Sequence, residues 1–165
     1  MEIRQIKTID AASFVNLIKQ VESESAFMLL EKGERNIGPE QQEKRIEDMK
    51  KEDNSTIFVA EENNELIGYL IAIGGNARRN KHSVYLVIGI LNRYRGLGIG
   101  TKLFKQLEEW ATEHSIHRLE LSVVTRNEAG LGLYKKMGFD IEGTKRQSLY
   151  IDGIFVDEYY MSKLL

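Results

Sequence analysis

Residues 84–104 read VYLVIGILNRYRGLGIGTKLF and combine three patterns that together decide the fold. The apolar run Val84–Leu91 has the length and composition of a buried central strand. A glycine-rich segment, Arg95–Gly100, follows it after a short connection. From Ile99 to His114, apolar residues recur with the period of a helix that packs one face on a core. The stretch therefore predicts a strand, a glycine-rich loop and a helix in direct succession.

The glycine-rich loop has the properties of a phosphate-binding segment. The first backbone N–H groups of a helix lack intrahelical partners and carry partial positive charge, which suits phosphate oxygens. Glycines let such a ligand approach the backbone because they carry no Cβ atom. Arg95 could add a charge-assisted contact or brace the loop. A plain glycine-rich turn is the alternative interpretation of the loop on its own.

Two familiar phosphate-binding patterns do not fit. The P-loop requires Gly-Lys-Ser/Thr at its end, whereas this loop ends Gly100-Thr101-Lys102. The dinucleotide pattern G-x-G-x-x-G fails because, counted from Gly96, its last glycine would fall on Thr101. The pattern that fits is R-x-x-G-x-G, with Arg95, Gly98 and Gly100 in the fixed positions.

The remaining elements indicate a mixed sheet with helices on its faces. We expect one strand, two helices, three strands, and then helix, strand, helix and closing strands. Pro39 suits the first turn of the second helix, and Asn63-Asn64 and Asp152-Gly153 mark hairpin turns. The expected elements are a strand near 2–7, a helix through 14–21, a mostly irregular segment 22–38, a helix from Pro39, strands Thr56–Ala60, Leu66–Ile73, Leu119–Val124, Phe139–Ile141, Gln147–Ile151 and Phe155–Leu164, and a helix from Asn127 to Met137 with a left-handed cap at Gly138.

A second motif lies beyond the loop. Residues 127–139 read NEAGLGLYKKMGF. Together with R-x-x-G-x-G, this stretch resembles the GNAT superfamily of N-acetyltransferases, whose pattern is N-x-x-A-x-x-L-Y-x-x-x-G-F. The resemblance covers residues 50–165 well and the first ~50 residues only in general layout. Gly130 departs from it, because the family commonly has alanine there; the helix loses about 1 kcal/mol of propensity.

The resemblance implies an α/β GNAT fold in a single domain, 1–165. It implies a mixed, mostly antiparallel sheet of about six or seven strands, with about four helices and two central parallel strands that splay apart. Acetyl-CoA would lie in the splay, with its pyrophosphate on the glycine loop and its pantetheine arm along the strand before it. The residues implied to bind this co-substrate are Ile88, Ile90, Leu91, Arg95, Gly96, Leu97, Gly98, Ile99, Gly100, Thr101, Asn127 and Tyr134.

The same resemblance implies acetyl transfer to a primary amine of a small molecule or protein, by direct attack in a ternary complex. The amide near Ile90 would serve as an oxyanion donor, and Gly89 would ease the strand separation. Tyr134 would be the general acid that protonates the departing thiolate. Tyr134 could instead be a core tyrosine, and Asn127 only a helix cap. A non-catalytic acyl-CoA sensor is the alternative function, because no base is evident; the weak candidates are Ser83, Tyr85, Glu22, Glu24 and Glu31.

Composition and charge exclude several classes of function. The chain of 165 residues has no cysteine, which excludes disulfides and thiolate nucleophiles. His114 and His117 lack an obvious third ligand, so no metal is expected. The net charge of −2 argues against nucleic-acid binding, and no apolar run suggests a membrane span or secretion signal, so a cytoplasmic location is expected. Arg78, Arg79 and Lys81 form a basic patch that is mostly explained as a solvated loop. Exposed closing strands could pair two copies into a homodimer.

Overall fold

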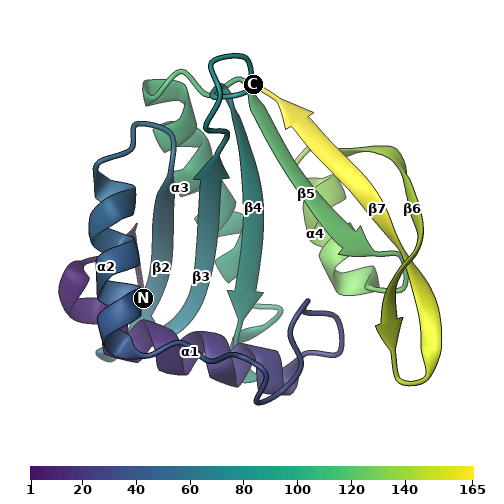
Figure 1. The fold of residues 1–165 in the computed structure, drawn as a ribbon, viewed down its shortest axis with the longest axis horizontal. Coiled ribbons are helices and arrows are strands. Elements are labelled where there is room, and N and C mark those ends of the chain that lie inside the picture. The colour runs from purple at the N-terminus through teal and green to yellow at the C-terminus, as the bar shows by residue number, and fades with distance from the viewer.

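A seven-stranded sheet carries helices on both of its faces in the computed structural model, which describes residues 1–165 (Figure 1). Figure 1 shows α1 and α2 in front of one half of the sheet. On the rear face, α3 lies behind that same half and α4 lies behind the half that contains β5 and β7. None of the helices has both the length and the hydrophobicity needed to cross a bilayer. The elements are β1 Glu2–Gln5, a 3-10 turn Thr8–Asp10, α1 Ala11–Glu24, α2 Pro39–Lys50, β2 Thr56–Glu62, β3 Glu65–Gly74, β4 Ser83–Ile90, a 3-10 turn Asn92–Tyr94, α3 Ile99–Glu113, β5 Arg118–Val124, α4 Glu128–Lys136, β6 Asp140–Ile151 and β7 Ile154–Leu164.

The sheet is antiparallel except at its centre. Its strand order is β1-β2-β3-β4-β5-β7-β6, and only β4 and β5 run parallel. These two strands pair over three positions, from Ser83–Arg118 to Tyr85–Glu120. Beyond Tyr85, β4 continues to Ile90 without a partner on this side, and Figure 1 shows β5 diverging from it. The predicted mixed sheet with splayed parallel strands is therefore confirmed.

The two faces of the sheet have different partners. The ring of Phe14 on α1 meets Tyr69 of β3 edge-on, with centroids 5.6 Å apart, so α1 covers the face that carries Tyr69. Gly89 is the register partner of Tyr69 and lies on the same face. A side chain on Gly68 would contact Ile90 and Ile99, so the opposite face packs on α3. The splay between β4 and β5 is thus bordered by α1 on one side and by α3 on the other.

Most predicted elements are present, and their ends follow local chemistry. Pro39 stands in the first turn of α2, and Asn63, Asn64, Gly138 and Asp152 adopt the positive φ angles that their turns require. The irregular segment after α1 begins only at Ser25, since α1 continues three residues beyond Val21, to Glu24.

One prediction about the closing strands was wrong. The two predicted strands, 139–141 and 147–151, correspond to a single strand, β6, which begins at Asp140 and has register shifts after Ile141 and after Lys145. Gln147 takes a positive φ of 51° inside it. The extra residues of these irregularities break the alternation that normally identifies a strand. The polar run 142–146 was therefore predicted as a connection between two strands.

Candidate active site

The glycine loop has the backbone that the motif predicts. Gly96 and Gly98 adopt φ angles of +75° and +79°, and a Cβ atom on either would meet no protein atom within 4 Å. Gly100 has another reason to be glycine. A Cβ atom there would lie 2.7 Å from a methyl carbon of Leu133, so its absence lets α3 and α4 pack closely. Two glycines thus leave open space in front of the loop, and the third serves the helix packing behind it.

A row of backbone amides faces this open space. The first hydrogen bond of α3 runs from the amide of Lys102 to the carbonyl of Gly98. The six preceding amides, from Gly96 to Thr101, donate to no acceptor in the protein. Because α3 is long and the loop residues before it, Gly96–Gly98, are exposed, these groups form a partially positive surface. This geometry suits the oxygens of a phosphate or pyrophosphate group.

The unpaired edge of β4 continues from this surface. The amide of Leu91 donates to the carbonyl of Ile67 over 3.0 Å, and its carbonyl accepts from the amide of Tyr94. Hydrogen-bonding direction alternates along an antiparallel strand. Because Leu91 bonds toward β3, the N–H and C=O groups of Ile88 and Ile90 point toward the splay. An extended ligand could therefore pair with Ile88 and with the amide of Ile90, whose carbonyl also accepts a long contact from Arg95, whereas the backbone of Leu91 is already engaged.

Arg95 returns to the end of β4. Its Nε atom donates to the carbonyl oxygen of Ile90 over 3.4 Å, a long contact that spans the connection between strand and loop. Its guanidinium is otherwise without a partner in the protein. The adjacent Leu97 is 65% exposed, and Ile99 is buried beneath the loop. The arrangement is consistent with both roles predicted for Arg95, which were to brace the loop and to contact an anion.

Tyr134 lies at the junction of α3 and α4. Its side chain is 9% exposed and meets Phe104 edge-on, with ring centroids 6.0 Å apart. No hydrogen bond from its hydroxyl occurs in the protein, yet no buried side-chain polar atom is left unsatisfied, so the hydroxyl reaches accessible space. Burial, with a smaller contribution from Tyr85 on β4, raises the pKa of Tyr134 to about 12. The phenol thus stays protonated and can donate a hydrogen bond.

Asn127 caps a helix and keeps an unpaired hydrogen-bond donor. Its Oδ1 atom accepts from the amide of Gly130 over 3.0 Å at the start of α4. The Nδ2 group has no partner in the protein and remains a free donor. A Cβ atom on Gly130 would lie 2.7 Å from Nδ2, so the glycine that departs from the family pattern gives this amide room. Asn127 can therefore cap α4 and still bind a ligand.

Two of the three carboxylates predicted as possible bases are bound by other groups, and the third is exposed. Glu22 is bound by Arg35, Glu24 accepts from the amide of Asn92 over 2.7 Å, and Glu31 is exposed in the segment after α1. Sequence reasoning missed Glu120, which is the register partner of Tyr85 at the last paired position before the splay. The alternation of apolar and polar residues along β5 could have shown that Glu120 faces away from α3.

Glu120 lines a cavity on the face of the sheet opposite α3. This cavity has a volume of about 440 Å³. Ser83 and Tyr85, two of the residues considered as bases, line it as well. The Nε atom of Arg118 donates to Glu120 over 2.9 Å and orients its carboxylate. The closed end of the splay therefore holds a carboxylate next to an accessible space that a small molecule could enter.

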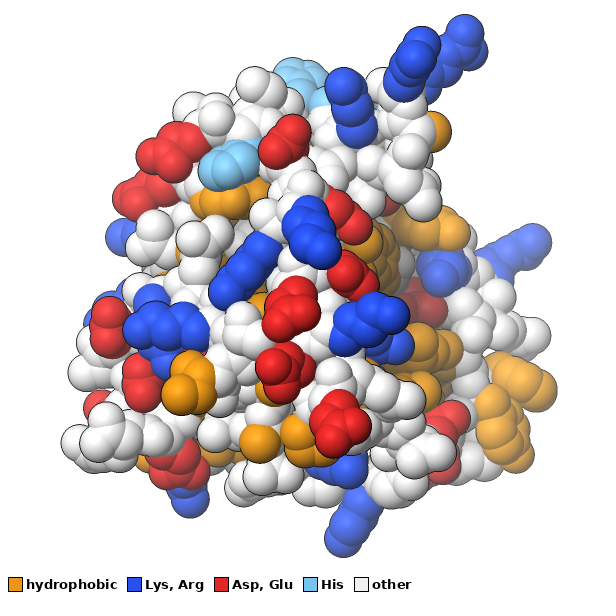
Figure 2. All heavy atoms as spheres, turned by 60° about the vertical axis from the view of Figure 1, so that its left-hand side comes forward, with side chains coloured by type: hydrophobic (Ala, Val, Ile, Leu, Met, Phe, Trp, Pro, Cys, Tyr) orange, Lys and Arg blue, Asp and Glu red, His pale blue; other side chains and the backbone are white.

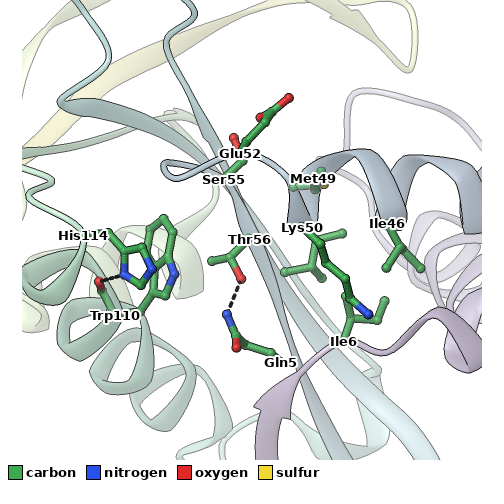
Figure 3. A pocket seen from close by; sticks show the side chains of 11 residues that line it. Gln5, Ile6, Ile46, Met49, Lys50, Glu52, Ser55, Thr56, Trp110 and His114 are labelled. Carbon is green, nitrogen blue, oxygen red and sulfur yellow. Dashed lines mark hydrogen bonds between the residues drawn. The ribbon is translucent and has the colours of Figure 1, made fainter.

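A second cavity, of about 310 Å³, lies at the other side of the sheet (Figure 3). It is lined by residues of β1, β2, α2 and α3. Its wall includes Trp110 stacked on His114, with ring centroids 4.7 Å apart, and a hydrogen bond of 3.0 Å from Gln5 to Thr56. No glycine loop or strand splay borders this cavity, so it is separate from the candidate active site.

The basic patch lies far from the glycine loop. Arg78, Arg79 and Lys81 are exposed in the connection before β4, whereas the loop follows the other end of that strand. The eight residues of β4 separate the two by about 26 Å, at about 3.3 Å per residue.

Figure 2 shows acidic and basic side chains interspersed over the helical side, with hydrophobic side chains in a recess beside them. Pairing of two copies through the closing strands stays a prediction.

Comparison with known proteins agrees with this geometry. The model of the acetyltransferase (GNAT) family matches residues 21–139. An acetyltransferase of the GNAT family from Streptococcus pneumoniae has the same fold, with a TM-score of 0.96 and 33% identity over 99% of this chain and 98% of that one. A GNAT phosphinothricin acetyltransferase from Sinorhizobium meliloti, solved with acetyl-CoA, gives a TM-score of 0.86 at 19% identity over 99% of this chain and 88% of that one.

A curated relative is similar over part of its length. The L-amino acid N-acetyltransferase AaaT of Escherichia coli is 29% identical over 101 residues, which are 61% of this chain and 62% of that protein. The chain thus spans under two thirds of this relative. The glycine loop and the splayed parallel strands both lie within the residues that the family model matches. The chain belongs to the acetyltransferase (GNAT) family.

Proposed function

We propose that the protein is an N-acetyltransferase that moves an acetyl group from acetyl-CoA to a primary amine. The observation that carries the proposal is the row of six unpaired amides, Gly96 to Thr101, at the start of α3 and beside the open edge of β4. In this assignment the amides bind the pyrophosphate. Family membership and the acetyl-CoA complex of the Sinorhizobium meliloti protein support the choice of co-substrate.

The pantetheine arm would extend from the loop along β4. We assign its backbone-like pairing to Ile88 and Ile90, whose polar groups point toward the splay. The free Nδ2 donor of Asn127 would contact the arm from α4. The amide of Ile90 would donate to the thioester oxygen as negative charge develops there. The thioester would thus be held between β4 and Tyr134.

The reaction would proceed by direct attack. The amine nitrogen forms a bond to the thioester carbon, the tetrahedral intermediate loses a proton from nitrogen, and the carbon–sulfur bond breaks. Tyr134 donates to the departing sulfur. A phenol with a pKa of about 12 is a weaker acid than a thiol of pKa about 8.5, so full transfer alone would be uphill by about 5 kcal/mol. Tyr134 therefore acts first as a hydrogen-bond donor, and the proton transfers as the intermediate collapses.

The proton released by the amine requires an acceptor. We assign this role to Glu120, acting through water, because it faces the cavity at the closed end of the splay. Arg118 donates to the carboxylate over 2.9 Å and fixes its orientation. With the proton leaving toward Glu120 and another arriving from Tyr134, the products are the acetylated amine and free coenzyme A, and both side chains return to their starting forms by exchange with water.

Calorimetric titration with acetyl-CoA tests the assignment of the loop. Gly98→Glu should place a carboxylate at the proposed pyrophosphate position and weaken binding by at least about 100-fold. Gly153→Glu is the matched control, because Gly153 has a φ of +80° and equally open surroundings but lies in the β6–β7 turn. Equal affinity of both variants would refute the assignment. Release of free thiol in the presence of amines then separates an enzyme from a sensor that only binds acetyl-CoA.

A further inference from the structure

Tyr69 of β3 is a buried phenol that the proposed chemistry does not use. Its side chain is 1% exposed, and a Cβ atom on Gly89 would lie 2.7 Å from its hydroxyl oxygen. No hydrogen bond from this hydroxyl occurs in the protein, yet no buried side-chain polar atom is left unsatisfied. The hydroxyl therefore lies beside Gly89 without a hydrogen-bond partner, next to the stretch of β4 assigned to the pantetheine arm.

An ion pair stands next to this phenol. Arg35, in the segment after α1, binds Glu22 of α1 through Nε–Oε1 and Nη2–Oε2 contacts of 2.8 Å each. Glu22 lies eight residues after Phe14, on the helix face that covers Tyr69. Glu22 is 3% exposed, and the side chain of Arg35 is 26% exposed. The buried carboxylate thus holds the partly exposed guanidinium in a fixed orientation.

The ion pair lies at the end of α1 that reaches β4, because Glu24, two residues after Glu22, accepts from the amide of Asn92 just beyond β4 over 2.7 Å. Burial raises the pKa of the Tyr69 phenol above its usual range; the charge of Glu22 raises it further, and the charge of Arg35 opposes this. Tyr69 therefore stays protonated and acts as a donor. Both oxygens of Glu22 are occupied by Arg35, whereas Nη1 of Arg35 has no partner. The free groups on this side of the splay are two donors, one of them cationic.

Two such donors match an anionic oxygen group on the acceptor. A carboxylate accepts several hydrogen bonds at once and gains from the positive charge of a guanidinium. In a free α-amino acid the carboxylate is separated from the amine by one carbon atom. A protein N-terminus carries a neutral amide at that position, and a polyamine carries only positive charge. We propose that Tyr69 and Arg35 bind the carboxylate of a free α-amino acid and thereby hold its amine at the splay.

This inference rests on the proposed function, and acceptor pairs that differ at one group test it. The purified protein would receive acetyl-CoA and each of several L-amino acids, the corresponding amino-acid amides and decarboxylated amines, and short peptides. The expected result is a preference for the acid over its amide of about 10- to 100-fold in kcat/KM, the range for hydrogen bonds to a charged group. A preference for amides, amines or peptides would overturn the inference.

Two variants separate recognition from structure. Tyr69→Phe keeps the ring packed on Phe14 and removes only the donor. Glu22→Gln with Arg35→Gln removes both charges together, so that neither is left buried alone. Each variant should lose at least about tenfold in kcat/KM for the acid, while kcat/KM for the amide and the affinity for acetyl-CoA stay unchanged. An equal loss for acid and amide would show a structural role and overturn the inference.

Failure of the proposed function would look different. If acetyl-CoA does not bind, both the function and the inference fail. If acetyl-CoA binds and a peptide or polyamine is acetylated while no amino acid is, only the inference fails. If acetyl-CoA binds and no amine is acetylated, the protein is a sensor and the inference fails with the enzymatic assignment.

Discussion

The ring of Tyr69 occupies the space into which a side chain on Gly89 would project, with ring carbons 2.6 Å from the position of such a Cβ atom. Neighbouring strands therefore fit at this point only because one of them contributes glycine. Gly89→Ala should displace the ring or the strand and lower the free energy of unfolding by about 1–3 kcal/mol. Urea denaturation measures the loss.

Gly143→Ala is the control for this substitution. Gly143 lies in β6, and a Cβ atom there would meet nothing within 4 Å, without a positive φ angle. The control should leave the free energy of unfolding within about 0.5 kcal/mol of the original protein. If Gly89→Ala is no more destabilising than this control, Tyr69 does not hold the position described.

Gly100 and Leu133 set the distance between α3 and α4. Gly100→Ala should cost about 1 kcal/mol, because the collision with the Leu133 methyl group outweighs the better helix propensity of alanine. In a Leu133→Ala background the same substitution should be neutral or stabilising. A double-mutant cycle on the free energy of unfolding measures the coupling, which we expect to exceed about 0.5 kcal/mol. Additive effects would show that the two positions are not in contact.

Sequence reasoning found the elements whose local chemistry is strong. The loop from Arg95 to Gly100, the Asn127 cap and the left-handed Gly138 follow from residue types that few other structures require. The family resemblance added the splay between the parallel strands. The continuity of β6 was missed because its irregularities break the period of two on which strand prediction depends.

The acceptor side was much less predictable. Tyr69 reads as an ordinary apolar strand residue, and its free hydroxyl becomes evident only when Gly89 is placed opposite it. Glu22 was considered as a base, but its pairing with Arg35 depends on how the segment after α1 folds back. Glu120 became a candidate base only through its register with Tyr85. Such relationships join distant parts of the chain. The alternation along β5 indicates which face Glu120 occupies, but a single sequence contains no signal for its neighbours on other strands.

Asp10 should make stability depend on pH in the acid range. Arg4 donates to both of its oxygens, over 2.8 and 3.0 Å, and thereby lowers the pKa of Asp10. A lowered pKa in the folded state means that ionised Asp10 stabilises the fold above the pKa of the unfolded chain, about 3.9, and that this stabilisation is lost as the pH falls through the folded value. Asp10→Asn should cost about 1–3 kcal/mol at neutral pH.

The comparison of unfolding free energies as a function of pH checks this sign. The difference between the original protein and Asp10→Asn should be constant above about pH 5 and should shrink as the pH falls below about 4. Glu40→Gln is the control, since Glu40 is an exposed acid in the first turn of α2. A difference that grows on acidification would contradict the assignment of the pair.

Tyr134→Phe tests the chemistry of acetyl transfer itself. The substitution keeps the ring that packs edge-on against Phe104 and removes only the hydroxyl. Affinity for acetyl-CoA should be unchanged, while kcat falls by about 10- to 100-fold because the departing sulfur loses its donor. With a pKa of about 12, Tyr134 remains protonated throughout the usual assay range. The ratio of the two kcat values should therefore be constant from about pH 6 to about pH 10. A ratio that declines toward one above about pH 9 would mean that Tyr134 ionises there, and an unchanged kcat would exclude Tyr134 from the reaction.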